Sequence, residues 1–293
     1  MVTAQTLKNI ATTMTDAALS RLQAGTTKVE IIHKPYPDWP YPRHLPHSAR
    51  ALTGSSTATG VSTFRVAVFD SSFNPPTLAH RALALLPAAA SSSEARLLLL
   101  SVRNADKVPR TGDASLEQRV QMMMRLAREV NAAVGLVDAP AFVHKAERLR
   151  TVLPARAQLA FIQGIDTLER FFAPRYYGDG SLEIMHAALR RFFAPDGDDA
   201  RVICARRTIE LADPQGESAI LEAARAWMQA DCITIVDIDN DLQAFSSSEV
   251  RAKVRARDHS WHLMVPDDIK EYIEEQRLYL DLSRHEFDGG KNQ

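Results

Sequence analysis

Six short apolar runs alternate with segments of helical periodicity between residues 64 and 276, and this alternation constrains the fold more than any other feature. The runs lack the polar and apolar alternation of half-solvated strands, so each is typical of a strand buried on both faces. They lie at Phe64–Phe69, Arg96–Val102, Val134–Asp138, Gln158–Gln163, Arg201–Ala205 and Cys232–Asp237. Strands alternating with helices predict an α/β fold with a doubly wound parallel sheet, which binds ligands beyond the carboxyl ends of its strands.

Amphipathic helices are expected in the gaps between these runs. In Leu116–Val130 the apolar positions recur every three or four residues, which indicates one buried stripe. The three methionines at 122–124 are interpreted as core residues of that stripe rather than as a metal or cofactor site. The other expected helices are Thr77–Leu86, Asp166–Ala173, Leu182–Phe193, Glu217–Gln229, Ser248–Arg257 and Pro266–Gln276.

The first 60 residues have a different character. Thr6–Leu22 has helical spacing and ends at Gly25, Lys28–Ile32 is typical of a short strand, and a proline-rich segment follows. We therefore predict an N-terminal extension and linker (residues 1–60), a main domain (residues 61–283) and a polar tail (residues 284–293). The extension could pack on the main domain, mediate self-association or move freely, and the sequence does not rank these alternatives.

Charge and composition exclude several classes of partner. The chain has 35 Lys and Arg against 36 Asp and Glu, a net charge of −1, which disfavours nucleic acid and anionic membranes as partners. No apolar run approaches the ~20 residues that span a bilayer, and no secretory signal is evident, so an intracellular location, cytoplasmic or nuclear, is expected. Cys204 and Cys232 lack metal-site spacing and are expected to be buried thiols.

A candidate phosphate site follows the first expected strand, where residues 71–80 read SSFNPPTLAH. A helix that begins at Pro75 or Pro76 would point its free N–H groups over the strand end, which favours an anion. Thr77 and His80 are three residues apart and therefore neighbours on one helix face. A hydroxyl and an imidazole beside free amides suit a phosphate, although singly Thr77 is typical of a cap and His80 of a structural histidine.

A second candidate phosphate site follows the last expected strand. Ser246, Ser247 and Ser248 precede a helix, where serines commonly cap the free N–H groups. Capping accounts for the serines but not for Arg251, which lies one turn beyond Ser247. Hydroxyls and a guanidinium at a helix N-terminus together favour a phosphate clamp.

The two segments together resemble the signatures of the nicotinamide and nicotinate mononucleotide adenylyltransferase family of the nucleotidyltransferase superfamily. Residues 72–80 resemble its SFNP-x-[HT]-x-x-H motif and residues 245–251 resemble its ISST-x-x-R motif. Residues 164–166, 101–107 and 264–279 are weaker matches to its GAD, PV-x-D-x-Y-K and VPD…LY elements. The resemblance covers Phe64 to Leu280 and points to a divergent, fungal-type member.

The resemblance implies a Rossmann-like domain that transfers AMP from ATP to the phosphate of a pyridine mononucleotide and releases pyrophosphate, with Mg²⁺ accompanying ATP and no metal ligand from the protein. The attacking phosphate is already ionised near neutral pH, so the protein must chiefly align it and neutralise charge. The implied catalytic residues are His80, Thr77 and Arg251. Implied ATP contacts are Ser71, Ser72, Phe73, Gly164, Asp166, Ser246, Ser247 and Ser248. Arg206 is a further candidate from its position at a strand end, with an ordinary surface arginine as the alternative. Implied mononucleotide contacts are Lys107 and Arg119; the family's aromatic partner of the pyridine ring has no clear counterpart, and Phe142 is the candidate for it.

Some residues depart from the family pattern. Ser71 stands where the family has glycine, and residues 101–107 lack its proline and tyrosine, so the acceptor side matches less well than the ATP side. An ATP-binding or weakly ATP-hydrolysing regulatory protein on the same fold is one alternative, and a nucleotidyltransferase with another acceptor is a second. The sequence does not choose between amide and acid mononucleotides, and it leaves a homo-oligomer open.

Overall fold

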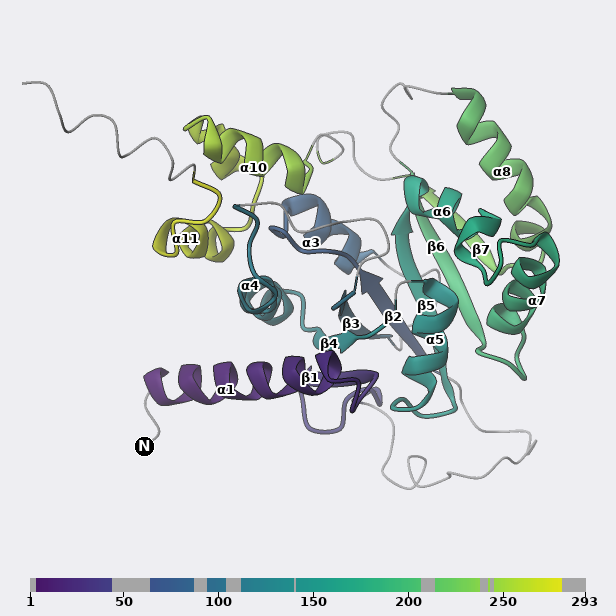
Figure 1. The fold of residues 1–293 in the computed structure, drawn as a ribbon, viewed down its shortest axis with the longest axis horizontal. Coiled ribbons are helices and arrows are strands. Elements are labelled where there is room, and N and C mark those ends of the chain that lie inside the picture. The colour runs from purple at the N-terminus through teal and green to yellow at the C-terminus, as the bar shows by residue number, and fades with distance from the viewer. Residues whose placement is uncertain are drawn as a thin grey trace, which may run out of the picture.

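The six buried runs form one sheet in a computed structural model that describes residues 4–43, 64–86, 94–103, 112–139, 141–206, 214–237, 242 and 245–280. The strand order is β1-β4-β3-β2-β5-β6-β7, and every neighbouring pair is parallel except the edge pair β1 and β4 (Figure 1). The strands are β1 (Val29–His33), β2 (Phe64–Asp70), β3 (Glu94–Ser101), β4 (Ala133–Val137), β5 (Ala157–Gly164), β6 (Ala200–Arg206) and β7 (Ile233–Asp237). The six predicted runs are thus confirmed as strands, with small shifts at their ends. The expected burial on both faces is wrong for β7, which lies at the edge of the sheet and is only partly buried.

The sheet has the strand order of dinucleotide-binding folds. Without β1 it runs β4-β3-β2-β5-β6-β7, so the chain starts in the middle, winds to one side and then to the other. The winding direction changes between β2 and β5, and ligands of such sheets bind at this switch point, beyond the carboxyl ends of the strands. The predicted doubly wound α/β fold is therefore confirmed, and the loops after β2 and β5 lie where a ligand is expected.

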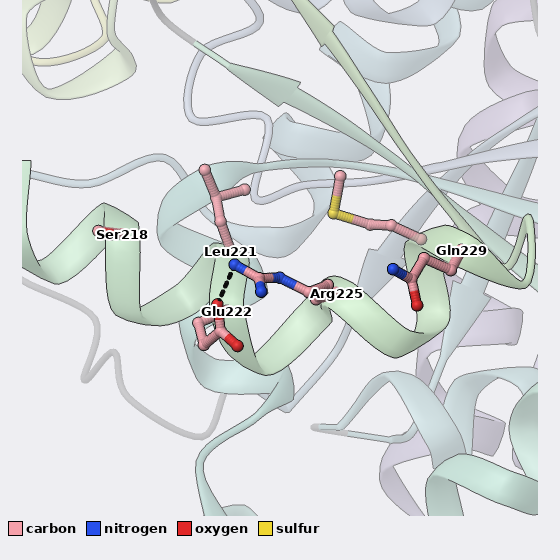
Figure 2. A pocket seen from close by; sticks show the side chains of 6 residues that line it. Ser218, Leu221, Glu222, Arg225 and Gln229 are labelled. Atoms are coloured by element: carbon pink, nitrogen blue, oxygen red, sulfur yellow. Dashed lines mark ion pairs between the residues drawn. The ribbon is translucent and has the colours of Figure 1, made fainter.

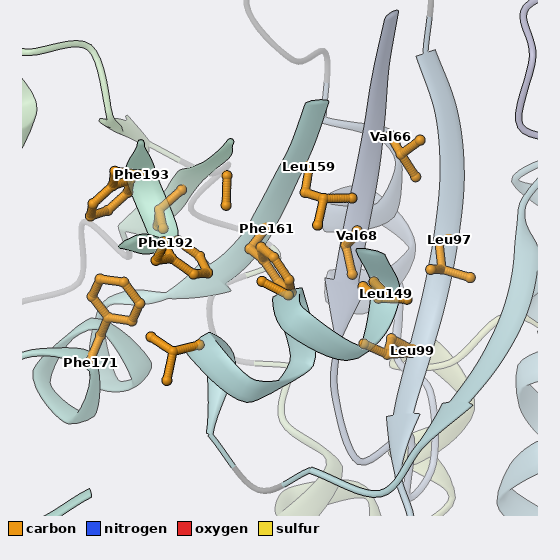
Figure 3. Close-up of a cluster of buried hydrophobic side chains, with 14 of the residues drawn as sticks. Val66, Val68, Leu97, Leu99, Leu149, Leu159, Phe161, Phe171, Phe192 and Phe193 are labelled. Atoms are coloured by element: carbon orange, nitrogen blue, oxygen red, sulfur yellow. The ribbon is translucent and has the colours of Figure 1, made fainter. Parts of the chain in front are cut away.

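Helices cover both faces of the sheet. The face that carries Val66, Val68, Leu159 and Phe161 is covered by α5 (Phe142–Arg150), α6 (Ile165–Phe171), α7 (Leu182–Phe193) and α8 (Pro214–Gln229). Figure 3 shows Leu149 of α5 and the rings of Phe171 and Phe192 packed over these strands. The opposite face is covered by α1 (Ala4–Gln23), α3 (Leu78–Leu85) and α4 (Leu116–Glu129).

A third apolar cluster joins the C-terminal helices to the rest. It contains side chains of α10 (Ser247–Arg255), the 3₁₀ helix η2 (His259–Leu263) and α11 (Asp267–Glu275), together with Met122 of α4. Figure 1 shows α10 and α11, in yellow-green, beside α3 and α4. Met122 and Met123 are fully buried, so the interpretation of the methionines as core residues is confirmed.

Two local predictions need correction. The helix after β2 begins at Leu78 rather than at Pro75 or Pro76, because Thr77 adopts extended backbone angles and caps it, which leaves both prolines in the loop. The helix α5 and the short 3₁₀ helix η1 (Pro174–Tyr176) were not predicted. In α5 the buried positions Val143, Ala146 and Leu149 recur every three residues, but the small alanine weakens this signal.

The described part of the N-terminal extension packs on the sheet. The predicted helix and strand are confirmed as α1 and β1, and Gly25 between them has a φ of 73°, the left-handed conformation that ends helices. Leu19 and Leu22 of α1 are buried in the cluster that covers β3 and β4. The expected boundary near residue 61 and the polar tail lie outside the described residues, so the division into domains stays a prediction.

The remaining structural predictions concern cysteines and membranes. Cys204 and Cys232 are both buried and both free thiols, as expected. Within the described ranges, no helix combines the length and the apolar character required to cross a bilayer.

The packing of α1 predicts that Leu22→Ala destabilises the whole domain. Leu22 is fully buried, so its truncation should lower the free energy of unfolding by about 2–5 kcal/mol. Ser20→Ala, at an exposed position two residues earlier in α1, is the control and should change it by less than about 0.5 kcal/mol. Urea unfolding followed by tryptophan fluorescence measures both, and an unchanged Leu22→Ala midpoint would show that α1 is not part of the core.

Candidate active site

The loop of residues 71–77, between β2 and α3, lies at the switch point of the sheet. Phe73 is fully buried, and its ring meets those of Phe69 and His80 at centroid distances of 5.6 and 5.8 Å. Its φ of 45° lies in the left-handed region, which costs a non-glycine residue free energy and persists only where the surroundings hold it. The loop backbone is therefore set by packing rather than by its own preference.

Thr77 and His80 form a reciprocal cap at the start of α3. The Thr77 hydroxyl accepts a hydrogen bond from the His80 N–H at 3.3 Å, and the Thr77 N–H donates to His80 Nδ1 at 3.1 Å. A ring nitrogen that accepts from a backbone N–H carries no proton in the neutral imidazole, so the proton is on Nε2. Nε2 lies 3.0 Å from the Ser71 hydroxyl. The predicted pairing of Thr77 and His80 is confirmed, and it leaves Nε2–H as a donor.

The two sequence motifs meet at this loop. The Ser247 hydroxyl donates to the carbonyl of Pro75 at 2.7 Å, and Arg251 Nη1 donates to the carbonyl of Asn74 at 2.6 Å. In return, the Thr77 hydroxyl donates to the carbonyl of Phe245 at 3.3 Å. The residues in each of these contacts are at least 168 positions apart in the sequence. The imidazole and the guanidinium therefore border the same loop.

Arg251 is held by a second group of partners. Its Nε lies 3.2 Å from Asp113 Oδ1, and both side chains are mostly buried. Arg119 lies in the same neighbourhood, and its Nε donates to the carbonyl of Ala114 at 3.0 Å. The negative charge of Asp113 favours its charged form, and the positive charge of Arg251 opposes it. Burial lowers the pKa of the Arg119 guanidinium. The structure thus brings Arg119 beside Arg251, and its predicted role with the mononucleotide stays a prediction.

The segment that contains Met264 and Tyr279 forms hydrogen bonds with the loop and with the start of α3. The buried Asn74 Oδ1 accepts from the Tyr279 hydroxyl at 2.9 Å and from the Ala114 N–H at 3.3 Å, and the Leu78 N–H donates to the carbonyl of Met264 at 2.9 Å. Burial raises the pKa of Tyr279 and so keeps its hydroxyl protonated. Asn74, Asp113 and Tyr279 were not predicted as site residues, although Asn74 and Tyr279 lie within the matched motifs.

The serines of both motifs have structural partners. Ser246 caps α10 by accepting from the Glu249 N–H at 3.1 Å, so the capping interpretation is confirmed for it. Ser248 is exposed, and its hydroxyl lies 3.5 Å from Arg251 Nη2. Ser71, which replaces the family glycine, is not among the residues with positive φ. A side chain therefore fits its backbone, and its hydroxyl contacts His80.

The end of β5 lies beside the end of β2. Phe69 of β2 is aligned with Ile162 of β5, so Gly164 follows at the same edge of the sheet. Gly164 caps α6 with a φ of −82°, and a Cβ added there would meet no atom within 4 Å. Neither the backbone conformation at position 164 nor crowding by the described residues therefore requires a glycine there. The space suits the close approach of a ligand.

Of the remaining predicted ligand contacts, the structure describes the side chains of two and not those of the other two. Asp166 lies in the first turn of α6, but its side chain is not among those described, and Lys107 lies outside the described residues. Arg206, at the end of β6, pairs with Asp237 at 2.7 Å and is partly exposed. Phe142 begins α5 and packs edge-on against Phe161 at 5.7 Å. Their roles with ligands stay predictions.

The hollow on α8 is separate from this site. It measures about 400 Å³ and is lined by Ser218, Leu221, Glu222, Arg225, Met228 and Gln229. Figure 2 shows these side chains along one helix, with an ion pair between Glu222 and Arg225. None of the predicted site residues lines it. Across the described part of the chain, no three His, Cys, Asp or Glu side chains form a group able to hold a metal ion.

Comparison with known proteins supports the fold and suggests a function. No protein-family model matches the chain. Over 158 residues it is 30% identical to a putative nicotinamide mononucleotide adenylyltransferase of Schizosaccharomyces pombe, which covers 53% of this chain and 58% of that relative. The chain therefore spans less than two thirds of the length of the curated relative that it matches.

Solved structures of a Plasmodium falciparum nicotinic acid mononucleotide adenylyltransferase are also similar. The complex with APC has a TM-score of 0.50 at 14% identity and covers 74% of this chain and 97% of that one. The complex with NaAD has a TM-score of 0.49 at the same identity and coverage. The first likeness confirms the predicted Rossmann-like fold.

The shared hydrogen bonds of Thr77 predict different stabilities for two substitutions. Thr77→Val removes a hydroxyl that caps α3 and donates to Phe245, and should lower the free energy of unfolding by about 1–2 kcal/mol. Thr77→Ser keeps the hydroxyl and should lose less. Urea denaturation measures the difference, and equal stabilities for the two variants would contradict the assigned hydrogen bonds.

Proposed function

We propose that this chain transfers the adenylyl group of ATP to a pyridine mononucleotide, as nicotinamide and nicotinate mononucleotide adenylyltransferases do. The observation that carries the proposal is the meeting of both motifs at the switch point, with His80 and Arg251 on either side of one loop. The similarity to the Schizosaccharomyces pombe relative supports it. The fold shared with the Plasmodium falciparum enzyme supports the placement of the nucleotide.

His80 would act as a hydrogen-bond donor to the phosphate under attack. Its neutral form carries the proton on Nε2, because Nδ1 accepts from the Thr77 N–H. The Ser71 hydroxyl is 3.0 Å from Nε2 and marks the place that a phosphate oxygen would take. A donor held in advance by a backbone hydrogen bond stabilises developing charge with little reorganisation.

The N-terminus of α10 would bind the outer phosphates of ATP. Arg251 donates one nitrogen to the carbonyl of Asn74 and extends a second toward the exposed Ser248. Together with the first free N–H groups of α10, these groups would donate hydrogen bonds to an anion. Gly164 and Asp166, across the switch point, would contact the nucleoside part of ATP, for which the open space beside Gly164 leaves room.

The reaction needs no base from the protein. A phosphate oxygen of the mononucleotide attacks the α-phosphorus of ATP, the bond to the bridging oxygen breaks, and pyrophosphate leaves with the bonding electrons. The protein positions the two phosphates and compensates their charge. Magnesium would enter with ATP and be held mainly by the phosphates. When bound, it would screen the triphosphate.

Two further expectations, on the cellular compartment and on the partners, belong with this proposal. Both cysteines are free thiols, which fits a reducing compartment, so we place the enzyme inside the cell, in the cytoplasm or nucleus. Its partners would be ATP and the mononucleotide.

The proposal predicts that wild-type protein with magnesium, ATP and either mononucleotide forms the corresponding dinucleotide. His80→Ala should lower kcat by about 100- to 1,000-fold, because it removes a donor to the reacting phosphate. His186→Ala, an exposed histidine on α7, is the matched control and should retain activity. Chromatographic detection of the dinucleotide measures this. Wild-type protein that binds ATP but forms no dinucleotide would contradict the proposal and favour the ATP-binding alternative.

The space beside Gly164 predicts a variant that folds but binds ATP poorly. Gly164→Val would put a side chain in that space: the φ of −82° suits any residue, and an added Cβ meets no atom within 4 Å. We expect a folded variant with a modest loss of stability from the poorer N-cap, and a KM for ATP raised roughly 10- to 100-fold, because the nucleotide is displaced. Gly164→Ala should have a smaller effect. An unchanged KM for ATP in Gly164→Val would place the nucleotide elsewhere.

A further inference from the structure

A buried ion pair lies directly beside the proposed site and takes no part in the steps above. Lys145 Nζ of α5 is 2.5 Å from Asp70 Oδ2 at the carboxyl end of β2, and the side chains are 6% and 10% exposed. Asp70 immediately precedes Ser71, whose hydroxyl contacts His80. The ammonium group also lies 4.8 Å above the ring of Phe142.

A second buried polar group lies on the neighbouring strand. Gln163 of β5 is 2% exposed, and among the described residues neither its amide nitrogen nor its amide oxygen has a hydrogen-bond partner. Side chains alternate along each strand, and Phe161 packs in the same cluster as Val66 and Val68. Gln163 and Asp70 therefore lie on the same face of the sheet as neighbours in register.

Stability does not account for this group of residues. Desolvating an ion pair costs free energy that apolar side chains of similar size would not cost, and a buried amide without partners costs more. Much of their surroundings is apolar, with Phe142, Phe161 and Leu149 on the same face. Polar groups retained at such cost at a switch point are expected to serve a ligand.

We propose that Asp70, Lys145 and Gln163 select the carboxamide rather than the carboxylate form of the pyridine mononucleotide. This inference rests on the proposed function. His80 contacts Ser71, and the neighbouring Asp70 pairs with Lys145, which lies over the Phe142 ring. With the acceptor phosphate at His80, its base would extend toward this aromatic ring. An amide both donates and accepts, so it complements the amide of Gln163 and can donate to Asp70. A carboxylate on the ligand would be repelled by the negative charge of Asp70. Lys145 would not attract it, because Asp70 already neutralises the Lys145 charge.

The test is the ratio of kcat/KM for nicotinamide mononucleotide to that for nicotinate mononucleotide, at saturating ATP. Wild-type protein should favour the amide. Asp70→Asn leaves the Lys145 charge uncompensated and should shift the ratio toward the acid by about tenfold or more. Lys145→Met leaves a lone carboxylate and should shift it the opposite way. The double variant Asp70→Asn, Lys145→Met should return close to the wild-type ratio.

Two further variants separate selection from stability. Gln163→Leu should lower kcat/KM for the amide more than for the acid. Asp198→Asn removes a buried carboxylate just before β6, at the amino end of the strands and so away from the proposed site. It should leave the ratio unchanged. If Asp70→Asn does not fold, as judged by thermal unfolding, the Lys145→Met and Gln163→Leu ratios decide.

The outcomes distinguish this inference from the proposed function. Dinucleotide formation with ratios that stay within about threefold of wild type in every folded variant would overturn the inference and leave the function intact. Shifts of the same sign in Asp70→Asn and Lys145→Met would also overturn it, because charge would not be the cause. Absence of dinucleotide from wild-type protein with both acceptors would overturn both proposals.

Discussion

The backbone carbonyl groups of Asn74 and Pro75 are the point on which the proposed site depends. They accept hydrogen bonds from Arg251 and Ser247 and thereby fasten the start of α10 to the loop after β2. The Asn74 side chain adds Tyr279 and Ala114 to the same junction. Because an unmade buried hydrogen bond costs roughly 1–3 kcal/mol, these contacts hold four distant segments in one arrangement.

Most of the fold could be predicted because its signals are local. Strands β2 to β7 appear as mostly apolar runs, although β7 is only partly buried, and α4 appears as a stripe repeating every three or four residues. The start of α3 was placed too early because proline at a helix start and proline in a preceding loop look alike in sequence. The two cases are distinguished by the Thr77 cap, and the same Thr77 hydroxyl also donates to the distant carbonyl of Phe245. The helix α5 was missed because Ala146 contributes little to its apolar pattern.

The site could be predicted only where residues lie in motifs. His80 and Arg251 were found through spacing and resemblance, and the pairing of Thr77 with His80 followed from helix geometry. Asp113 and Lys145 could not be found this way, since a lone Asp or Lys is usually a solvated surface residue. Their importance comes from partners far along the chain, Arg251 and Asp70, which only the folded structure brings together.

The bond between Tyr279 and Asn74 joins residues 205 positions apart and has a consequence for how the protein is made. A ribosome releases the first motif long before the segment that braces it. Long-range contacts of this kind form late, since the intervening chain must first be brought together. The emerging polypeptide would therefore pass through a stage at which most of its sheet can assemble while the loop after β2 still lacks its support. The loop after β2 would therefore reach its final arrangement only after the segment around Tyr279 has been synthesised.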